Sequence, residues 1–215
     1  MRPHQPGDRN ATLEAYLDEL ARWSQHLNLT SIPRDQMWSR NIAEAEELLE
    51  VAAPGTGCSV VDIGSGGGVP GVVIAILRPD LSMTLLDADR RKSGFLIHVA
   101  GLLGLQSVHV VADRAEDVGR RDGMRATFDL AISRATAPPA VLCELALPLL
   151  RTGGTLCALV ADAPAALATC SAAASACGGG APEAPSDGIL RVRKVAPTPD
   201  EYPRRPGTPS RHPIS

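Results

Sequence analysis

Aromatic residues are scarce in this sequence, at 3% of 215 residues. The core must therefore be filled by aliphatic side chains, and few rings are available for the stacking platforms of single-strand nucleic-acid binders. No apolar run approaches the roughly 18 residues that a membrane-spanning helix needs, and the N-terminus lacks the apolar region of a signal peptide. We therefore expect a cytoplasmic protein with no membrane partner.

Metal-site and common hydrolytic motifs are also missing. The five cysteines form no C-x-x-C pair and the five histidines are scattered, so we expect reduced, buried thiols and no bound metal. The sequence contains no G-x-x-x-x-G-K-[ST] phosphate loop, no H-E-x-x-H motif and no G-x-S-x-G nucleophile elbow. The chemistries that depend on those motifs can be set aside.

Composition is otherwise that of a folded globular chain, with 44% apolar and 21% charged residues. The formal charge of -3 conceals an asymmetry, because residues 190–215 hold six Lys and Arg but two Asp and Glu. Any contact with a polyanion should therefore be local.

The hydrophobic pattern changes near residue 57. Before it, helical spacing predicts two amphipathic helices, the first capped by Asn10 or Thr12 after a leader of residues 1–9, and the second capped by Asp35. After it, β-branched runs alternate with helical segments, as in a doubly wound, mostly parallel α/β sheet. The predicted strands are Ser59–Ile63, Ser82–Asp87, Val108–Ala112, Phe128–Ser133, Thr155–Val160 and Ile189–Val195. The predicted helices among them are Val69–Leu77, Arg90–Leu103, Pro138–Leu150 and Pro164–Cys177.

These patterns divide the chain into a leader with a helical extension (1–57), an α/β domain (58–196) and a basic, Pro-rich tail (197–215). The Ala-rich stretch 161–185 has few large apolar residues and predicts a peripheral helix and a mobile loop. Six of the 18 prolines fall between residues 197 and 213. The tail is therefore expected to lie over the domain as a strap, or to be partly disordered.

A glycine-rich turn follows the first predicted strand, in the text Asp62-Ile63-Gly64-Ser65-Gly66-Gly67-Gly68-Val69-Pro70-Gly71. Glycine permits positive φ and lets main-chain N–H groups approach a ligand closely. Asp62 precedes the turn, and Asp87 ends the second strand, where a carboxylate can accept hydrogen bonds from both hydroxyls of a ribose. The pattern fits a site for a dinucleotide or for S-adenosylmethionine. The alternative is a turn with only a structural role, capped by Asp62, that binds no ligand.

The charge of Asp62 favours S-adenosylmethionine. A carboxylate beside the turn would repel a pyrophosphate, whereas it suits the ammonium and sulfonium of that cofactor, directly or through water. The sequence thus predicts a Rossmann-like class I methyltransferase with Asp62, Gly64, Gly66 and Asp87 at the cofactor.

Two more segments should reach the same edge of the sheet. The segment 112–117 follows the third strand, where its backbone could contact an adenine; a solvated turn with an Arg114–Asp117 pair is the alternative. Arg134 ends the fourth strand and opens onto the crevice, where it could touch cofactor or substrate, or pair with a carboxylate that shapes the loop.

Several short motifs occur in order along the chain: Asn28-Leu29-Thr30-Ser31, the glycine turn with its Val69-Pro70-Gly71 continuation, Leu85-Leu86-Asp87, Arg114-Ala115-Glu116-Asp117 and Ser133-Arg134-Ala135. Together they resemble the bacterial small-subunit ribosomal RNA guanine-N7 methyltransferase G family, also called RsmG or GidB. The resemblance covers roughly residues 28–159, and the tail 202–209 is similar to the family's basic ending. It implies S-adenosylmethionine held at Gly64, near Val69, by Ala115 and Glu116 and by Arg134, with Asp87 at the ribose.

The resemblance also implies a methyl acceptor, a guanine of 16S ribosomal RNA in the small subunit. Guanine N7 carries a lone pair and no proton, so positioning and electrostatics could suffice, and no catalytic base is assigned. The cations expected on the RNA side are Arg40, Arg134, Arg204 and Arg205, with Arg211 and 90–92 as further phosphate contacts; a solvated surface is the alternative.

Two positions depart from the family pattern. Asn41 stands where members usually have His, and Val160-Ala161 stands where they usually have Lys-Gly. These changes leave open a relative that methylates a small molecule or another RNA, and a non-enzymatic module that only binds the cofactor. A wide, basic crevice would suit RNA, whereas a closed, apolar one would suit a small molecule.

Overall fold

The computed structural model describes residues 8–215, so most of the expected leader lies outside the described residues. The first helix, α1 (Arg9–Ser24), begins earlier than predicted. Its N-cap is Asp8, whose carboxylate accepts the N–H groups of Asn10 and Ala11 at 3.0 and 3.2 Å. Neither Asn10 nor Thr12 is the cap, because Asp8 satisfies the free amides of the first turn well before Leu13, the first residue of the apolar stripe.

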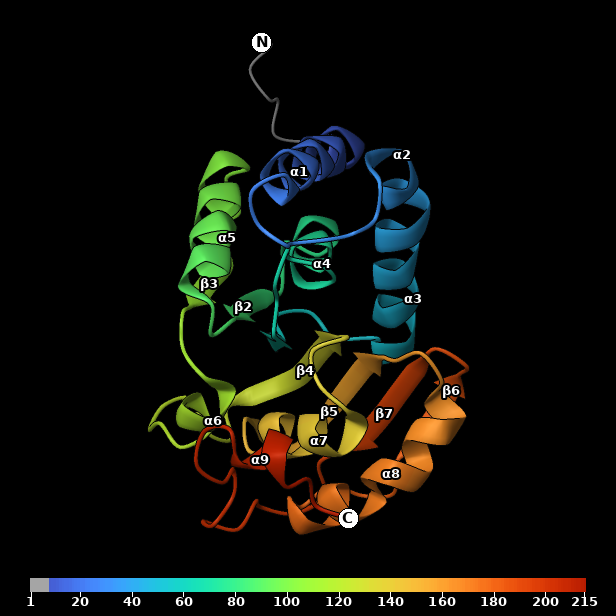
Figure 1. Ribbon diagram of the computed structural model, residues 1–215, viewed down its shortest axis with the longest axis vertical. Helices are drawn as coiled ribbons and strands as arrows, with labels where there is room; N and C mark the ends of the chain where they lie inside the picture. The colour runs from blue at the N-terminus through green and yellow to red at the C-terminus, as the bar shows by residue number, and fades with distance from the viewer. Residues whose placement is uncertain (1–7) are drawn as a thin grey trace.

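The core is a seven-stranded sheet of order β3-β2-β1-β4-β5-β7-β6, in which β1 to β5 pair in parallel and β7 is antiparallel to both β5 and β6. The mostly parallel, doubly wound architecture is therefore confirmed (Figure 1). The chain reverses its direction of progress between β1 and β4, which opens a crevice at the carboxyl ends of the strands. The strands are β1 (Ser59–Ile63), β2 (Ser82–Leu86), β3 (Val108–Val111), β4 (Phe128–Arg134), β5 (Leu150–Leu159), β6 (Glu183–Ser186) and β7 (Ile189–Arg193).

Helices cover both faces of the sheet (Figure 1). One face packs against α4 (Gly71–Leu77) and α5 (Arg90–Leu102), over which lie α1 and the run formed by α2 (Arg34–Met37), the π-helix η1 (Trp38–Ile42) and α3 (Ala43–Ala52). The other face packs against α6 (Ala115–Val118), α7 (Pro139–Ala146) and α8 (Ala163–Ala176). The predicted helical extension thus stacks on α4 as a further layer.

Two predictions for the C-terminal half are wrong in detail. The helix predicted to reach Leu150 ends at Ala146, and β5 begins at Leu150 rather than at Thr155. Pro148 cannot continue the helix, while the paired glycines at 153 and 154 weaken the strand pattern without preventing the strand. The helix predicted from Val69 begins at Gly71, with Pro70 as its N-cap.

The Ala-rich segment contains more regular secondary structure than expected. Small side chains of α8 are buried against the sheet and α7, and the predicted loop contains the edge strand β6. Alanine lets elements approach closely, so a helix with few large apolar residues can still pack. The sequence pattern did not predict this strand because it contains Pro185. Proline counts against a strand in a sequence pattern, although it is tolerated at the edge of a sheet.

The thiols are free, as expected, with Cys58 half-buried and the other four buried. Among residues 8–215 no group of three or more His, Cys, Asp and Glu side chains could hold a metal ion. No helix in that range is long and apolar enough to cross a bilayer.

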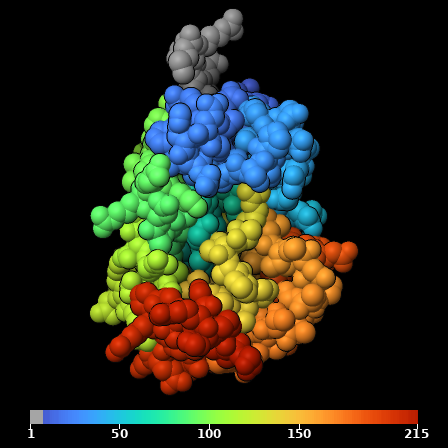
Figure 2. Space-filling model, in the orientation of Figure 1, coloured from blue at the N-terminus to red at the C-terminus, as the bar shows by residue number. Residues whose placement is uncertain are grey.

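Residues 197–215, here called the strap, lie beside α6 and α7 (Figures 1 and 2). Two arginines of the domain hold its first half. Arg120 donates to the carbonyls of Asp200, Glu201 and Pro203, and Arg125 donates to those of Thr198, Pro199 and Tyr202. The strap ends in the short helix α9 (Thr208–Arg211).

Candidate active site

The glycine turn after β1 is fixed by its neighbours on both sides. The N–H groups of Gly64 and Ser65 donate to the carbonyl of Leu86 at 2.8 and 3.1 Å, which ties the turn to the end of β2. From the other side, the buried Tyr16 hydroxyl donates to the carbonyl of Gly67 at 2.7 Å. Gly64 and Gly66 have φ of +70° and +55°, a conformation that side chains disfavour. The turn is therefore held open in a shape that needs glycine.

Asp87 lies directly against this turn. Its Oδ2 accepts the Gly66 N–H at 2.8 Å, and its Oδ1 accepts the Asp89 N–H at 2.8 Å. Each oxygen of a carboxylate can accept a second hydrogen bond, so Asp87 remains able to receive two hydroxyls. The arrangement places an oriented carboxylate beside exposed main chain.

The turn and Asp87 form one wall of a cavity of about 470 Å³, a volume within the range of small-molecule sites. The segment 113–116 and the loop 134–137 form other walls. All the predicted cofactor residues except Asp62 line it: Gly64, Gly66, Val69, Asp87, Ala115, Glu116 and Arg134. The structure thus brings together residues that are spread over 71 positions of the sequence.

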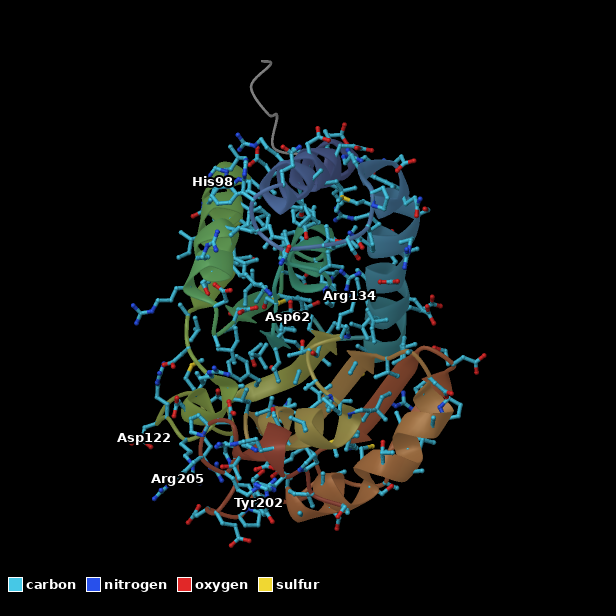
Figure 3. The ribbon with its side chains drawn as sticks, viewed as in Figure 1. Asp62, His98, Asp122, Arg134, Tyr202 and Arg205 are labelled. Atoms are coloured by element: carbon cyan, nitrogen blue, oxygen red, sulfur yellow. The ribbon has the colours of Figure 1, made fainter. Side chains whose placement is uncertain are left out.

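Asp62 lies behind the turn instead of lining the cavity, and its side chain is fully buried (Figure 3). Its Oδ2 accepts the Gly71 N–H at 3.2 Å, while its Oδ1 has no direct hydrogen-bond partner among the described residues. Burial raises the pKa of Asp62 to about 7. From the sequence, Asp62 was predicted to meet the cofactor either directly or through water. The buried position of Asp62 fits the contact through water.

Arg134 is held by the N-terminal extension. Its Nη1 donates to Asn41 Oδ1 at 3.0 Å and to Glu44 Oε2 at 2.7 Å, which joins the end of β4 to η1 and α3. The alternative in which Arg134 pairs with a carboxylate to shape the loop is therefore what the structure shows, although the residue also lines the cavity. Asn41 is fully buried, and its Nδ2 has no direct partner among the described residues.

A second, larger cavity of about 1170 Å³ meets the first along Leu29 and the loop 134–137. It contains the predicted substrate residues Arg40 and Arg134 and the divergent pair Val160 and Ala161. Three carboxylates also line it: Glu44, Glu47 and Asp162. The crevice is therefore wide, as an RNA substrate requires, but its charge is mixed rather than basic.

Comparison with known proteins settles the family. The family model described as rRNA small subunit methyltransferase G, GidB, matches residues 9–181. Proteins named ribosomal RNA small subunit methyltransferase G are similar throughout. The one from Moorella thermoacetica is 36% identical over 217 residues, 95% of this chain and 90% of that protein. The one from Chloroflexus aggregans is 37% identical over 216 residues, with the same two shares.

The chain belongs to the small-subunit ribosomal RNA methyltransferase G family. Solved structures support the class I methyltransferase fold at lower similarity. A putative S-adenosyl-L-methionine-dependent methyltransferase from Methanococcus maripaludis aligns with a TM-score of 0.56 and 14% identity, over 91% of this chain and 97% of that chain.

Membership of the methyltransferase G family implies S-adenosylmethionine as the cofactor. The residues present fit it. The cavity has the volume of a small-molecule site, it exposes the backbone of the glycine turn, and Asp87 is oriented for a ribose. The unpartnered Oδ1 of Asp62 gives a buried acceptor behind the turn, where an amino group bridged by water would satisfy it.

The three strap arginines named from the sequence, Arg204, Arg205 and Arg211, lie outside both cavities. Arg204 binds the buried carboxylate of Glu144 through Nε and Nη2, at 2.9 and 2.6 Å. Arg205 is exposed and points away from the molecule (Figure 3). Arg204 is therefore part of the strap's attachment, while Arg205 is free to meet a partner.

The wall residues of the cofactor cavity that sequence reasoning missed include Leu29, Thr136 and Ser210. Leu29 could have been found, because the Asn28-Leu29-Thr30-Ser31 motif is part of the family pattern. No role was assigned to that motif from the sequence. Thr136 donates to the carbonyl of Ile63 at 2.8 Å and closes the loop onto β1. Nothing in the local pattern marks Ser210.

Proposed function

We propose that this protein transfers a methyl group from S-adenosylmethionine to N7 of a guanine in 16S ribosomal RNA. The supporting observation is the junction of the two cavities along the loop 134–137. One cavity suits a nucleoside-sized cofactor, and the other is an open crevice of about 1170 Å³ that can admit a splayed-out base. Methyl transfer would take place where the two meet.

Each cofactor residue has a distinct task in this proposal. Asp87 would accept the ribose hydroxyls, the backbone at Ala115 and Glu116 would border the adenine, and Asp62 would reach the amino group through water. When bound, S-adenosylmethionine supplies an electrophilic methyl group on a positively charged sulfur. The protein then needs to align a guanine N7 lone pair with that methyl carbon, and no side chain has to remove a proton.

Arg134 would be the positioning residue between cofactor and acceptor. Its guanidinium is fixed from behind by Asn41 and Glu44, so it holds one orientation in the wall that both cavities share. Phosphates of the RNA would be met by exposed cations, Arg40 at the crevice and Arg205 and Arg211 on the strap. The Glu144 pair removes Arg204 from that set.

The test is methyl transfer from tritiated S-adenosylmethionine to small ribosomal subunits isolated from a strain that lacks the modification. We expect incorporation into 16S RNA, and mass spectrometry of the digested RNA should show N7-methylguanosine. The Asp87→Ala variant is the control for cofactor-dependent transfer. Cofactor binding without transfer to subunits or to free 16S RNA would overturn the assignment of the acceptor.

The mixed charge of the crevice supports a second candidate, transfer to another RNA or to a small molecule. Glu44, Glu47 and Asp162 oppose a polyanion there, and Val160-Ala161 adds no cation. Incubation of the labelled cofactor with total RNA and with a small-molecule extract separates these outcomes. Label that enters either pool, but not the small subunit, would favour the second candidate.

A further inference from the structure

The strap completes the wall of the cofactor cavity. Ser210, on α9, lines the same cavity as the glycine turn, Asp87 and Ala115. In Figure 1 α9 lies beside α6 and α7. The segment 113–116, which leads into α6, lines the cavity. A cofactor whose adenine occupies that part of the cavity would therefore have the strap as its neighbour.

One carboxylate stands between the cavity and the strap. Glu116 lines the cavity, is buried, and accepts the Gly207 N–H through Oε1 at 2.8 Å. Gly207 has a φ of +79° and begins the turn into α9. The position of α9 is thus tied to a residue that would contact the cofactor.

The two halves of the strap are fastened very differently. Residues 198–204 are held by the guanidinium groups of Arg120 and Arg125 and by the Arg204–Glu144 pair. Beyond Arg204, the Gly207–Glu116 contact is the one direct hydrogen bond between the strap and the rest of the protein among the described residues. The second half is also held by a hydrogen bond within the strap, from Arg204 Nη2 to the His212 carbonyl at 2.8 Å, and by the packing of Ile214 against the core. The first half is therefore an anchor, and the second half, with fewer hydrogen bonds to the domain, can respond to what fills the cavity.

We propose that residues 207–215 are a cofactor-dependent wall of the active site, which S-adenosylmethionine orders and which couples its binding to contact between RNA and the exposed Arg205 and Arg211. The coupling to RNA rests on the proposed function, whereas the ordering by cofactor does not. Because coupling is reciprocal, whatever factor the cofactor adds to RNA affinity, RNA must add to cofactor affinity.

Hydrogen exchange of the full chain tests the ordering without RNA. S-adenosylhomocysteine is the probe, since it keeps the nucleoside and cannot transfer a methyl group. We expect exchange at the amides of 207–212 to slow about tenfold when the probe is saturating, because a bound ligand stabilises the closed wall. Amides of β6, at the far edge of the sheet, are the internal control. Unchanged exchange at 207–212 with the probe bound would overturn the proposal.

Variants test whether the wall contributes to affinity. A chain ending at Pro206 keeps the anchor, and calorimetry should show about tenfold weaker binding of S-adenosylhomocysteine. Ser210→Trp, which places a large side chain at the cavity wall, should weaken binding similarly, while Ser215→Trp at the end of the same segment should not. If the shortened chain does not fold, the Ser210 and Ser215 pair decides. Equal affinity for full-length protein and Ser210→Trp would contradict the role of the wall.

The last arm concerns RNA. Binding of a 16S RNA fragment is measured with and without saturating S-adenosylhomocysteine. The full chain should bind the fragment about fivefold or more tightly with the probe, and the chain ending at Pro206 should show no such gain. A gain of equal size in both chains would overturn the coupling. Failure of every form to bind RNA would count against the proposed function, while the exchange result would still decide whether the cofactor orders the strap.

Discussion

Asp62 and Asp87 stand at the ends of neighbouring strands, yet their surroundings give them different chemistry. Asp87 receives two main-chain N–H groups at the edge of the cavity, so it is an oriented acceptor. Asp62 is sealed behind the glycine turn with one oxygen unpartnered, and burial raises its pKa to about 7. Two residues of one type thus need different tests.

For Asp87, substitution by Ala should weaken S-adenosylmethionine binding by about 1 to 3 kcal/mol, since it removes a charged acceptor of hydrogen bonds. Asp87→Asn should lose less, because its amide oxygen can still accept the Gly66 N–H. Calorimetry measures both, with Asp122→Ala at an exposed position as the control. An unchanged dissociation constant for Asp87→Ala would exclude the residue from the site.

For Asp62, the raised pKa predicts a pH dependence of stability without cofactor. Between its ordinary value of 3.8 and about 7, the unfolded chain has lost the proton and the folded protein keeps it. The free energy of unfolding should therefore fall as pH rises through that window, by on the order of 1 kcal/mol per pH unit from this group. Urea unfolding of Asp62→Asn should show a flatter profile than the unsubstituted protein. Parallel profiles would mean that Asp62 is charged in the folded state.

Local sequence order was enough to predict that most of these residues line one cavity, because a strand, a glycine turn and an acid after the next strand meet at one edge of any parallel sheet. The depth of Asp62 could not be predicted, since it depends on the Tyr16 contact and on the approach of Gly71. The hydrogen-bond partners of Arg134 could not be predicted either. Asn41 and Glu44 lie 93 and 90 positions away, on a helical extension whose docking the pattern does not specify.

The strands and helices that carry a strong hydrophobic period were predictable, and β1 was predicted to the residue. Elements whose burial depends on small side chains or on an edge position were not. Helix α8 packs through alanine and cysteine, and β6 contains a proline, so neither shows the usual pattern. The turn between β1 and α4 was predicted only in part. Its glycines indicate that something approaches the backbone closely, but they do not say which residues do so.

At α4, a pair of glycine substitutions tests that contact. A Cβ added to Gly71 would lie 2.5 Å from both Asp62 Oδ2 and Leu85 Cδ2, so Gly71→Ala should destabilise the protein by about 1 to 3 kcal/mol. Gly94, inside α5, has open space at that position, and Gly94→Ala should stabilise by about 0.5 to 1 kcal/mol through helix propensity. Urea unfolding compares the two. If both variants change the free energy of unfolding by the same amount, the turn can move to accommodate a side chain at residue 71.

At the scale of the whole molecule, the exposed arginines of the strap, Arg205 and Arg211, lie on one short stretch of surface. The two neighbouring arginines there have opposite surroundings: Arg204 faces a carboxylate that is 1% exposed, and Arg205 faces solvent. The net charge of -3 gives no hint of this division.

Arg204→Ala should therefore destabilise the protein by about 3 kcal/mol, because the buried Glu144 carboxylate loses its cation and keeps only the main-chain N–H of residue 204. Arg205→Ala should change stability by less than about 0.5 kcal/mol. It should weaken RNA binding instead and lower the slope of log affinity against log salt by about one. Thermal unfolding and salt-dependent RNA binding separate the two roles. A reversed pattern would mean that the strap is attached through Arg205.

The walls of the cofactor cavity are drawn from residues as far apart in the sequence as Leu29 and Ser210. A nascent chain on the ribosome therefore lacks part of this pocket until residue 210 has been synthesised and has left the exit tunnel. S-adenosylmethionine would meet the complete pocket only after that point, and could not assist the folding of the segments made earlier.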